Sequence, residues 1–212
     1  MSSAYHTSRL THDPRRSALW NALWRFHFSR LIGPEDCVLD MGCGYADFVN
    51  SVHANRRIAL DSWPGFTDYL EEGVEGVVGP VTQLGFLDDG SVDFAFASNL
   101  FEHITQADLI TVLSALRSKL SPRGTLTLLQ PNWRYAFREY FDDYTHIAVY
   151  SHTSMSDLLT AQDWEVLDVR ARFLPLTIKS RLPVSPLLIK AYLLSPIKLM
   201  GKQMLITARP RR

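Results

Sequence analysis

Two carboxylates stand at the ends of two apolar segments, and a glycine turn follows the first of them. In residues 37–50, CVLDMGCGYADFVN, Asp40 lies at the end of an apolar run and is followed by Gly42 and Gly44. Asp61 closes the next apolar run, RIALD. Glycine after a strand lets the backbone turn tightly and approach a ligand, and a carboxylate after the second strand suits the two hydroxyls of a ribose. These residues predict a site for a nucleoside-containing cofactor.

The same turn narrows the choice of cofactor. Loops that bind dinucleotides follow a GxGxxG pattern, whose last glycine would fall where this chain has Asp47. An acid beside a pyrophosphate is repulsive, whereas a cofactor with an ammonium and a sulfonium and no phosphate tolerates it. The residues leave open that Gly42 and Gly44 only form a tight turn, but the position of Asp61 argues against that alternative.

The elements that must position these residues alternate between strand and helix patterns. A helix is expected from Asp13, a good N-cap before Pro14, to the break at Gly33. Apolar segments predict strands, and periodic segments predict helices between them. The expected strands are 37–41, 57–61, 76–79, 92–99, 125–130, 164–174 and 203–209, and the expected helices are 46–55, 64–72, 105–120 and 154–162. This alternation is typical of a doubly wound α/β fold with a parallel sheet, and its last two strands suggest an antiparallel edge pair.

Composition sets limits on the function. The 212 residues suffice for one domain, and Lys+Arg and Asp+Glu are both 22, which disfavours a nucleic-acid partner. The two cysteines, Cys37 and Cys43, lie at the two ends of one expected strand and form no CxxC pair, so we expect reduced thiols, no metal and a cytoplasmic location. No run reaches the roughly 18 apolar residues of a membrane span.

Four segments, in order, resemble the motifs of class I S-adenosylmethionine-dependent methyltransferases of the small-molecule type. VLDMGCGYADF resembles their motif I, IALDSWP their second-strand acidic motif, LDDGSVDFAFASNLFEHI their fourth-strand motif, and LRSKLSPRGTLTLLQPN the segment leading into their fifth strand. The resemblance covers about residues 36–132. It implies a Rossmann-like, three-layer α/β/α fold with a seven-stranded sheet in the order 3-2-1-4-5-7-6, strand 7 antiparallel. It also implies S-adenosyl-L-methionine as cofactor and S-adenosyl-L-homocysteine as product.

The resemblance further implies a role for individual residues around the cofactor. Asp40, Gly42 and Gly44 would frame its methionine moiety, with Asp40 near the ammonium, and Asp61 would bind the ribose hydroxyls. Ser62 or Trp63 would lie near the adenine. These assignments place the cofactor at the ends of the first two strands.

The fourth-strand motif is expected to flank the reacting end of the cofactor. Asn99, with Leu100 and Phe101 behind it, would lie beside the sulfonium. Aromatic faces stabilise cations, which makes Tyr45 and Phe101 candidates for that contact, with core packing as the alternative for Phe101.

Two positions depart from the family pattern. Ala46 stands where a third glycine is common. Residues 79–81, Gly-Pro-Val, stand where an acid near the adenine amine is common, so adenine recognition is expected from the Val81 backbone, Thr82 or Gln83.

Candidate catalytic residues follow from the acceptor chemistry. A hydroxyl acceptor needs a base because its pKa lies far above 7, whereas a carbon or amine acceptor needs none. His146 is the candidate base, with Asp142 or Asp143 to orient its ring, and a surface histidine beside surface acids is the alternative. His103 is a second candidate, expected to shape the cofactor pocket or cap a helix.

Segments outside the motifs are expected to select the acceptor. Within a single domain, 1–212, we expect an N-terminal helical cap at 1–35 and substrate-side or lid insertions at 132–155 and 175–202. Residues 175–202 are apolar with interspersed lysine and arginine, which fits either an interfacial helix at a lipid or a helix that covers the sheet edge or a dimer contact. The second is favoured because three prolines interrupt the segment. Four residues of the first insertion suit a sugar acceptor: Tyr135, Arg138, Tyr140 and Tyr144.

The sequence therefore predicts a cytoplasmic methyltransferase acting on a small-molecule acceptor, in particular a hydroxyl of a sugar, a glycan precursor or a natural product. The first alternative is an NAD- or nucleotide-sugar-dependent oxidoreductase, which Asp47 disfavours. The second is a non-catalytic S-adenosylmethionine-binding module, which Asp61 and Asn99 disfavour. We expect no nucleic-acid partner and no stable membrane insertion. The oligomeric state stays open, with a homodimer as one possibility.

Overall fold

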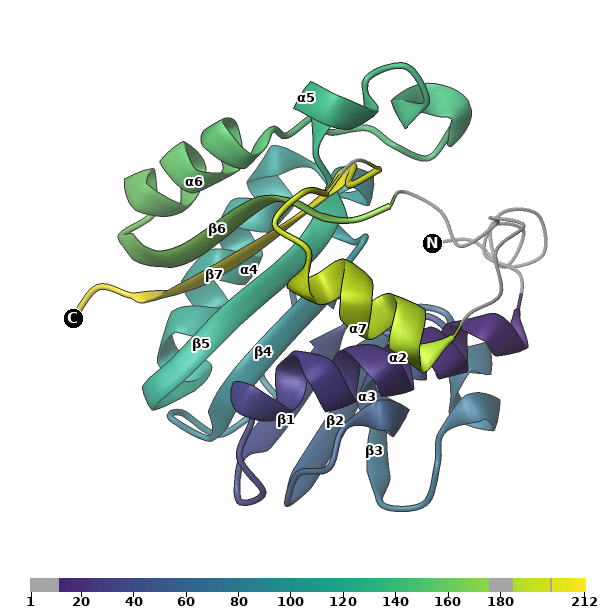
Figure 1. Cartoon of the computed structure of the whole chain (residues 1–212). Helices are drawn as coiled ribbons and strands as arrows, with labels where there is room; N and C mark the ends of the chain where they lie inside the picture. The colour runs from purple at the N-terminus through teal and green to yellow at the C-terminus, as the bar shows by residue number, and fades with distance from the viewer. Residues whose placement is uncertain (1–11, 176–184, 199) are drawn as a thin grey trace.

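The strand segments assemble into one seven-stranded sheet. The computed structural model describes residues 12–175, 185–198 and 200–212 (Figure 1). The strand order is β3-β2-β1-β4-β5-β7-β6, and β7 is antiparallel to both of its neighbours, whereas β1 to β5 pair in parallel. The strands are β1 (Cys37–Met41), β2 (Arg56–Asp61), β3 (Val74–Val78), β4 (Val92–Ser98), β5 (Leu120–Pro131), β6 (Trp164–Leu174) and β7 (Gln203–Pro210). The predicted order and the antiparallel strand are confirmed.

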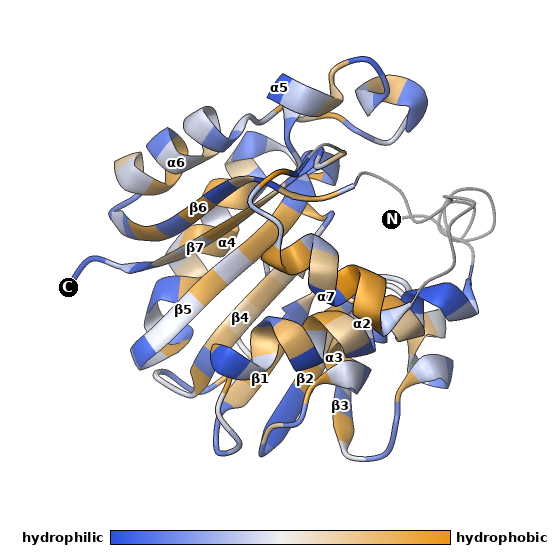
Figure 2. Cartoon of the chain, in the orientation of Figure 1, coloured by the Kyte–Doolittle hydropathy of each residue, from blue (hydrophilic) through white to orange (hydrophobic). Residues whose placement is uncertain are grey.

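Helices cover both faces of this sheet, because the central strands are apolar on both sides. Leu39 and Met41 of β1 join a core with α4 (Gln106–Lys119) and α6 (His152–Ala161). Val38 joins a second core with α2 (Pro14–Phe26), α3 (Asp47–Ser51) and, at its margin, α7 (Pro186–Leu194). In Figure 1, α2 and α7 lie in front of the sheet and α4 lies behind it. The colouring of Figure 2 shows the apolar central strands enclosed between these helices. The three-layer arrangement is therefore the predicted one.

Side chains cap the first turns of two predicted helices. Asp13 accepts a hydrogen bond from the Arg15 backbone N–H, and Pro14 occupies the first helical position. Thr105 caps α4 by accepting from the Asp108 backbone N–H. The first helix ends at Phe26, earlier than the predicted break at Gly33, and a 3₁₀ turn, Phe28–Arg30, follows it. This turn buries Phe28 in the core, which explains the early end.

Several other elements differ from the predictions in length. The helix after β1 spans only Asp47–Ser51, and the helix predicted after β2 is a 3₁₀ helix, Pro64–Tyr69. β5 starts directly after α4, and its pairing with β4 shifts between Val92 and Phe94, so that Pro122 and Gly124 are accommodated in an irregular stretch. Three short elements were not predicted: η3 (Phe101–His103), α5 (Trp133–Ala136) and η4 (Tyr140–Asp142). Cys37 and Cys43 are free thiols.

The parallel pairing brings the polar residues to one edge. In register, Asp40 of β1 faces Ala59 of β2, two residues before Asp61, and Phe96 of β4. Asn99 follows the end of β4, and α5 follows the end of β5 at the top of Figure 1. The carboxyl ends of β1, β2, β4 and β5 are where ligands bind in open α/β sheets.

Candidate functional site

The turn after β1 is held against β2. The backbone N–H groups of Gly42 and Cys43 both donate to the Leu60 carbonyl, at 2.8 and 3.2 Å. Gly42 and Gly44 have φ values of 70° and 57°, and Ala46 has 58°. A Cβ on Gly42 would lie 2.8 Å from Cδ1 of Leu100. The left-handed backbone and the close approach of Leu100 explain why glycine is needed at this turn.

Asp61 ties the end of β2 to the glycine turn. Its Oδ2 accepts from the Gly44 backbone N–H at 2.9 Å, and its Oδ1 accepts from the Trp63 backbone N–H at 2.9 Å. A carboxylate offers about four lone-pair positions, so two remain for ligand hydroxyls. Asp61 is therefore placed and oriented as a ribose-binding carboxylate requires.

Asp40 lies beneath the turn and is only 2% exposed. Burial, and then the negative charge of Asp61, raise the pKa of Asp40 to about 8, and Asp47 adds to the effect. Asp47 itself accepts a hydrogen bond from the Ser17 hydroxyl at 3.0 Å. An arrangement of three acids in a confined space favours a cationic group and repels a pyrophosphate. The charges therefore fit a cofactor with an ammonium and no phosphate.

An aromatic cluster lies beside Asp61. Tyr45 meets Trp63 edge-on with ring centroids 5.2 Å apart, and it meets Tyr69 edge-on at 4.7 Å. The His12 ring lies 5.4 Å from Tyr45. Ser62, next to this cluster, is exposed. The structure thus brings Tyr45 and Trp63 together, two residues that the sequence analysis placed at different parts of the cofactor.

The segment after β3 contributes mainly apolar surface. Val81 is 8% exposed and belongs to the main core, Thr82 is half-buried, and Gln83 is exposed. The Gly79 backbone N–H donates to the Asp61 carbonyl at 2.9 Å, which brings this segment alongside the end of β2. The start of the expected adenine-side segment, Gly79, therefore lies next to Asp61.

Asn99 connects two strands at the same edge. It has a φ of 50°, a left-handed conformation that asparagine tolerates better than most residues. Its Oδ1 accepts from Gln203 Nε2 at 2.9 Å, which links β4 to β7, and its Nδ2 donates to Ser98 Oγ at 3.1 Å. Leu100 packs against the glycine turn, and Phe101, 1% exposed, lies in the main core.

Two histidines meet beyond the ends of β4 and β5. The rings of His103 and His146 meet edge to face, with centroids 4.8 Å apart and an interplanar angle of 62°. His146 Nδ1 lies 2.6 Å from the Tyr140 carbonyl oxygen. Because a carbonyl only accepts, Nδ1 carries the proton, and Nε2 is the basic nitrogen of His146.

His103 is held by a neighbouring acid through a hydroxyl. Thr145 Oγ1 donates to Asp143 Oδ1 at 2.6 Å and lies 2.9 Å from His103 Nδ1, from which it accepts. Asp143 is thus the acid connected to His103 through Thr145, whereas Asp142 is exposed. Burial, and then the charge of His146, lower the pKa of His103 to about 4.

Two buried polar residues at this edge were missed by the sequence analysis. The Glu102 carboxylate is fully buried without a hydrogen-bond partner, and burial raises its pKa to about 8. Both amide atoms of Gln130 are also buried and unpaired. Glu102 stands between Phe101 and His103 in a stretch the sequence analysis did use, but nothing in that stretch reveals its burial. Donor atoms of Glu102, His103 and His146 lie within 4.8 Å of one another, and such side chains can also bind divalent metals.

The segment after β5 presents aromatic side chains around the histidines. Tyr144 is 68% exposed and Phe141 57%. Tyr140 is fully buried and donates from its hydroxyl to the Ala148 carbonyl, so its proposed part in holding a sugar is wrong. Tyr135 is covered by Arg172, whose guanidinium carbon lies 4.0 Å from the ring centroid. A hollow of about 380 Å³ is lined by residues that follow the two histidines in the chain: Thr105, Gln106, Ile147, Ala148, Val149 and Tyr150.

Comparisons with known proteins identify the family and the fold. A family model described as a methyltransferase domain matches residues 14–169. A solved S-adenosylmethionine-dependent methyltransferase from Archaeoglobus fulgidus superposes with a TM-score of 0.68 at 20% identity, over 98% of this chain and 99% of that one. A methyltransferase from Mesorhizobium loti gives 0.64 at 13% identity, over 89% and 97%.

A third solved structure contains ligands. It is the 1,6-didemethyltoxoflavin-N1-methyltransferase of Burkholderia thailandensis, with bound 1,6-didemethyltoxoflavin and S-adenosylhomocysteine, and it gives a TM-score of 0.62 at 20% identity, over 99% of this chain and 85% of that one. No curated protein matches the sequence.

The predicted fold, enzyme class and cofactor are thereby confirmed. The family match favours a methyltransferase over the alternative of an oxidoreductase. The glycine turn and the acids Asp40 and Asp61 fit the cofactor S-adenosylmethionine, since they favour a cation and leave acceptor positions for hydroxyls. The chain belongs to the methyltransferase domain family and is a class I S-adenosylmethionine-dependent methyltransferase.

Proposed function

We propose that the protein methylates a hydroxyl group of a small-molecule acceptor in the class of sugars, glycan precursors and natural products. The observation that carries the proposal is the fixed tautomer of His146. Its Nδ1–H donates to the Tyr140 carbonyl at 2.6 Å, which leaves Nε2 as a base at the edge where the cofactor binds. A hydroxyl acceptor is the class that needs such a base.

The cofactor is held by the residues of β1, β2 and their turns. Asp40 pairs with the ammonium of the methionine moiety, and Gly42 and Gly44 allow the backbone to approach it. Asp61 accepts from the ribose hydroxyls with the lone pairs that Gly44 and Trp63 leave unused. These contacts fix the position of the reacting end.

The remaining cofactor contacts come from neighbouring turns. Ser62, Trp63 and the Val81 backbone border the adenine, on the side where Tyr45 completes the aromatic cluster. Asn99 and Leu100 border the methionine end, and Phe101 supports them from the core. Phe101 therefore acts by packing and not by contact with the sulfonium.

Methyl transfer then depends on the position of the acceptor oxygen and on the removal of the proton of the acceptor hydroxyl. S-adenosylmethionine, when bound, supplies a methyl group on a sulfonium, which is a good leaving group. His146 would take the proton of the acceptor hydroxyl on Nε2 while the methyl group passes to that oxygen, the methyl–sulfur bond breaks and S-adenosylhomocysteine leaves as a neutral thioether. His103, with its pKa near 4, stays neutral at pH 7 and is too weak a base for this role. The chain Asp143–Thr145–His103 instead holds the ring against which His146 packs.

The acceptor class is supported by the segment 132–155. It carries the exposed rings of Phe137, Phe141 and Tyr144, which suit the faces of a sugar or another ring, and Arg138, which lies over the Phe137 ring. The Burkholderia thailandensis structure holds a small molecule, which fits an acceptor of that size. We assign 132–155 as the acceptor-side insertion of this single-domain protein.

Replacement of His146 tests this proposal. With a hydroxylated acceptor found by screening, His146→Ala lowers kcat by about 10²- to 10⁴-fold, the usual contribution of a general base. The affinity for S-adenosylhomocysteine stays the same, because the proposal assigns His146 to the acceptor and not to the cofactor. His53→Ala, which removes a histidine away from the site, is the matched control and keeps normal turnover. Normal turnover in His146→Ala, or turnover with amines only, contradicts the proposal.

The two neighbouring acids give a second comparison. Asp143→Asn lowers turnover because Thr145 loses the acceptor that orients its hydroxyl toward His103. Asp142→Asn leaves turnover unchanged, since Asp142 is exposed. The reverse result would return Asp142 to the catalytic role expected from the sequence.

A further inference from the structure

The helix α7 is apolar on its outward side. Its sequence is PLLIKAYLL, and none of its residues is buried. Ile189, Tyr192 and Leu193 pack against the core, whereas Leu187, Leu188 and Leu194 point away from it, with exposed fractions of 74%, 53% and 67%. Ile197 and Met200, just after the helix, are each 65% exposed. Figure 2 shows this helix in orange on the front of the molecule. Exposed apolar patches of this kind mark interaction sites.

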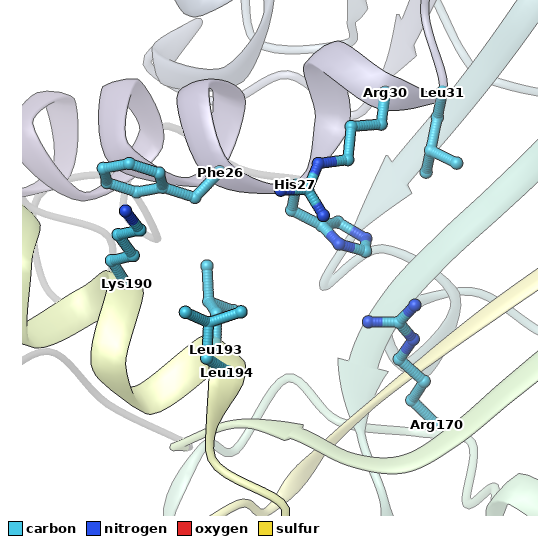
Figure 3. Close-up of a pocket in the computed structure, with 8 residues that line it drawn as sticks. All are labelled: Phe26, His27, Arg30, Leu31, Arg170, Lys190, Leu193 and Leu194. Carbon is cyan, nitrogen blue, oxygen red and sulfur yellow. The ribbon is translucent and has the colours of Figure 1, made fainter.

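A cavity of about 150 Å³ lies between α7, the end of α2 and β6. Three cationic side chains line it, Arg30, Arg170 and Lys190, and the lining includes no acidic residue. Figure 3 shows these three side chains around the same opening as the apolar Phe26 and Leu193. The cavity thus joins positive charge to an apolar wall.

Most of this positive charge has no acidic partner among the residues that the structure describes. In the described parts of the chain, Arg30 and Lys190 form no ion pair, and only Arg170 is paired, with Asp168 at 2.9 Å. Lys190 Nζ lies 5.5 Å from the Phe26 ring centroid. The pKa of His27, which also lines the cavity, is lowered to about 4 by burial and then by the charge of Arg170. The chain has no net charge, so this excess is local.

The combination identifies the chemistry of the partner. Clustered cations beside exposed leucines match an anionic phospholipid, whose phosphate meets the cations and whose acyl chains meet the apolar side chains. A second copy of this chain centred on the cavity fits poorly, because near a two-fold axis the same cations would lie opposite one another. Among the described residues no helix is long and apolar enough to cross a membrane, and α7 has 9 residues, so contact is with the surface.

We propose that α7 and the cationic cavity beside it form a docking surface for a membrane that contains anionic phospholipid. The phosphate of one lipid enters the cavity between Arg30, Arg170 and Lys190. Leu187, Leu188 and Leu194 enter the boundary between headgroups and acyl chains. The docking surface goes beyond the proposed methyl transfer and does not depend on it. It corresponds to the less favoured of the two predictions for residues 175–202, an interfacial helix at a lipid.

Vesicle co-sedimentation of the full chain tests the proposal. We expect binding to vesicles of phosphatidylcholine with one-third phosphatidylglycerol, weakening with added salt, and no binding to phosphatidylcholine alone. A cation near such a surface contributes about fivefold to the affinity, so Lys190→Glu, which also adds a negative charge, lowers the affinity by roughly 10- to 30-fold. Arg211→Glu makes the same change in charge at an exposed residue outside the cavity and is the matched control.

A second variant tests the apolar part. The double substitution Leu187→Ser and Leu194→Ser reduces vesicle binding and keeps the unfolding transition of the parent, because both side chains are exposed. Equal binding of parent and both variants overturns the proposal, and so does the absence of binding to anionic vesicles. Binding of inorganic phosphate without vesicle binding overturns it too. A dimer in sedimentation velocity that the double substitution dissociates assigns the surface to a second copy and likewise overturns it. None of these readouts requires methyl transfer, so they fail or succeed independently of it.

Discussion

At the scale of single residues, Asp40 is the acid whose burial and acidic surroundings most strongly favour a cationic ligand. It is buried at the end of β1, and its nearest charged neighbours are also acids. In the ligand-free protein its pKa of about 8 lies above the unfolded value of 3.8. The raised pKa contributes stability fully below pH 4, and this contribution is lost as the pH rises to 8. A bound ammonium lowers the pKa of Asp40 again, because it favours the ionised carboxylate.

Cofactor binding should therefore depend on pH in a predictable direction. Between pH 6 and 7.5, the affinity for S-adenosylhomocysteine rises by up to about tenfold per pH unit, because Asp40 must lose its proton to pair with the ammonium. Calorimetry in two buffers of different ionisation enthalpy will detect the released proton. Asp40→Asn binds more weakly and shows almost no change over this range. A flat profile in the parent protein would show that Asp40 is already ionised or lies outside the site.

Residue types and spacing were sufficient to predict that the two acids and the glycine turn lie at one edge of the sheet. Asp40, the glycine turn and Asp61 meet as expected, since each follows a strand in the same parallel sheet. Burial was not predictable in the same way. Glu102 and Tyr140 stand in polar-looking segments, and only the fold shows that both are inside. The choice between Asp142 and Asp143 likewise depended on the η4 turn.

At the scale of elements, Asn99 holds the junction between β4 and β7. Asn99→Ala is expected to lower the free energy of unfolding by about 1–3 kcal/mol, because alanine tolerates the left-handed backbone less well and because Gln203 Nε2 loses its acceptor. Asn99→Gly tolerates the left-handed backbone but also lacks the side-chain acceptor, so it separates the cost of the backbone from the cost of the lost hydrogen bond. Urea unfolding measures the free energy of unfolding of each variant. In a double-mutant cycle, Asn99→Ala and Gln203→Ala should be non-additive; simple additivity would mean that the hydrogen bond contributes nothing.

Strand positions could be predicted from the sequence more closely than element lengths. The predicted bounds 37–41 and 164–174 coincide with β1 and β6. β1 is buried along its whole length, whereas β6 is an edge strand that mixes apolar and charged residues and is largely exposed along its middle. Helix lengths depended on tertiary packing. The helix expected at 46–55 ends at Ser51, and Pro64–Tyr69 forms a 3₁₀ helix although its pattern resembles an α-helix. The segment 176–184, inside the second predicted insertion, lies outside the described residues.

At the scale of the whole molecule, parallel strand order gathers distant residues at one edge. Asp40, Asp61, Asn99 and His146 come from four different parts of the chain and lie at or beyond the carboxyl ends of β1, β2, β4 and β5. The strand order could be predicted because four motifs occurred in sequence. The places of 132–155 and of α7 could not be predicted, because both segments lack a repeating pattern and their positions depend on packing.

The most direct test of the central claim is a calorimetric titration of the purified protein with S-adenosylhomocysteine and, separately, with NAD. We predict micromolar binding of S-adenosylhomocysteine and no binding of NAD, because an ammonium favours the ionised form of Asp40 and pairs with it, whereas a pyrophosphate offers this buried acid no cation. In the same experiment Asp61→Ala should weaken the binding by about 1–3 kcal/mol, through the loss of charge-assisted hydrogen bonds to the ribose. Binding of NAD, or unchanged affinity in Asp61→Ala, would contradict the assignment of these acids to the cofactor.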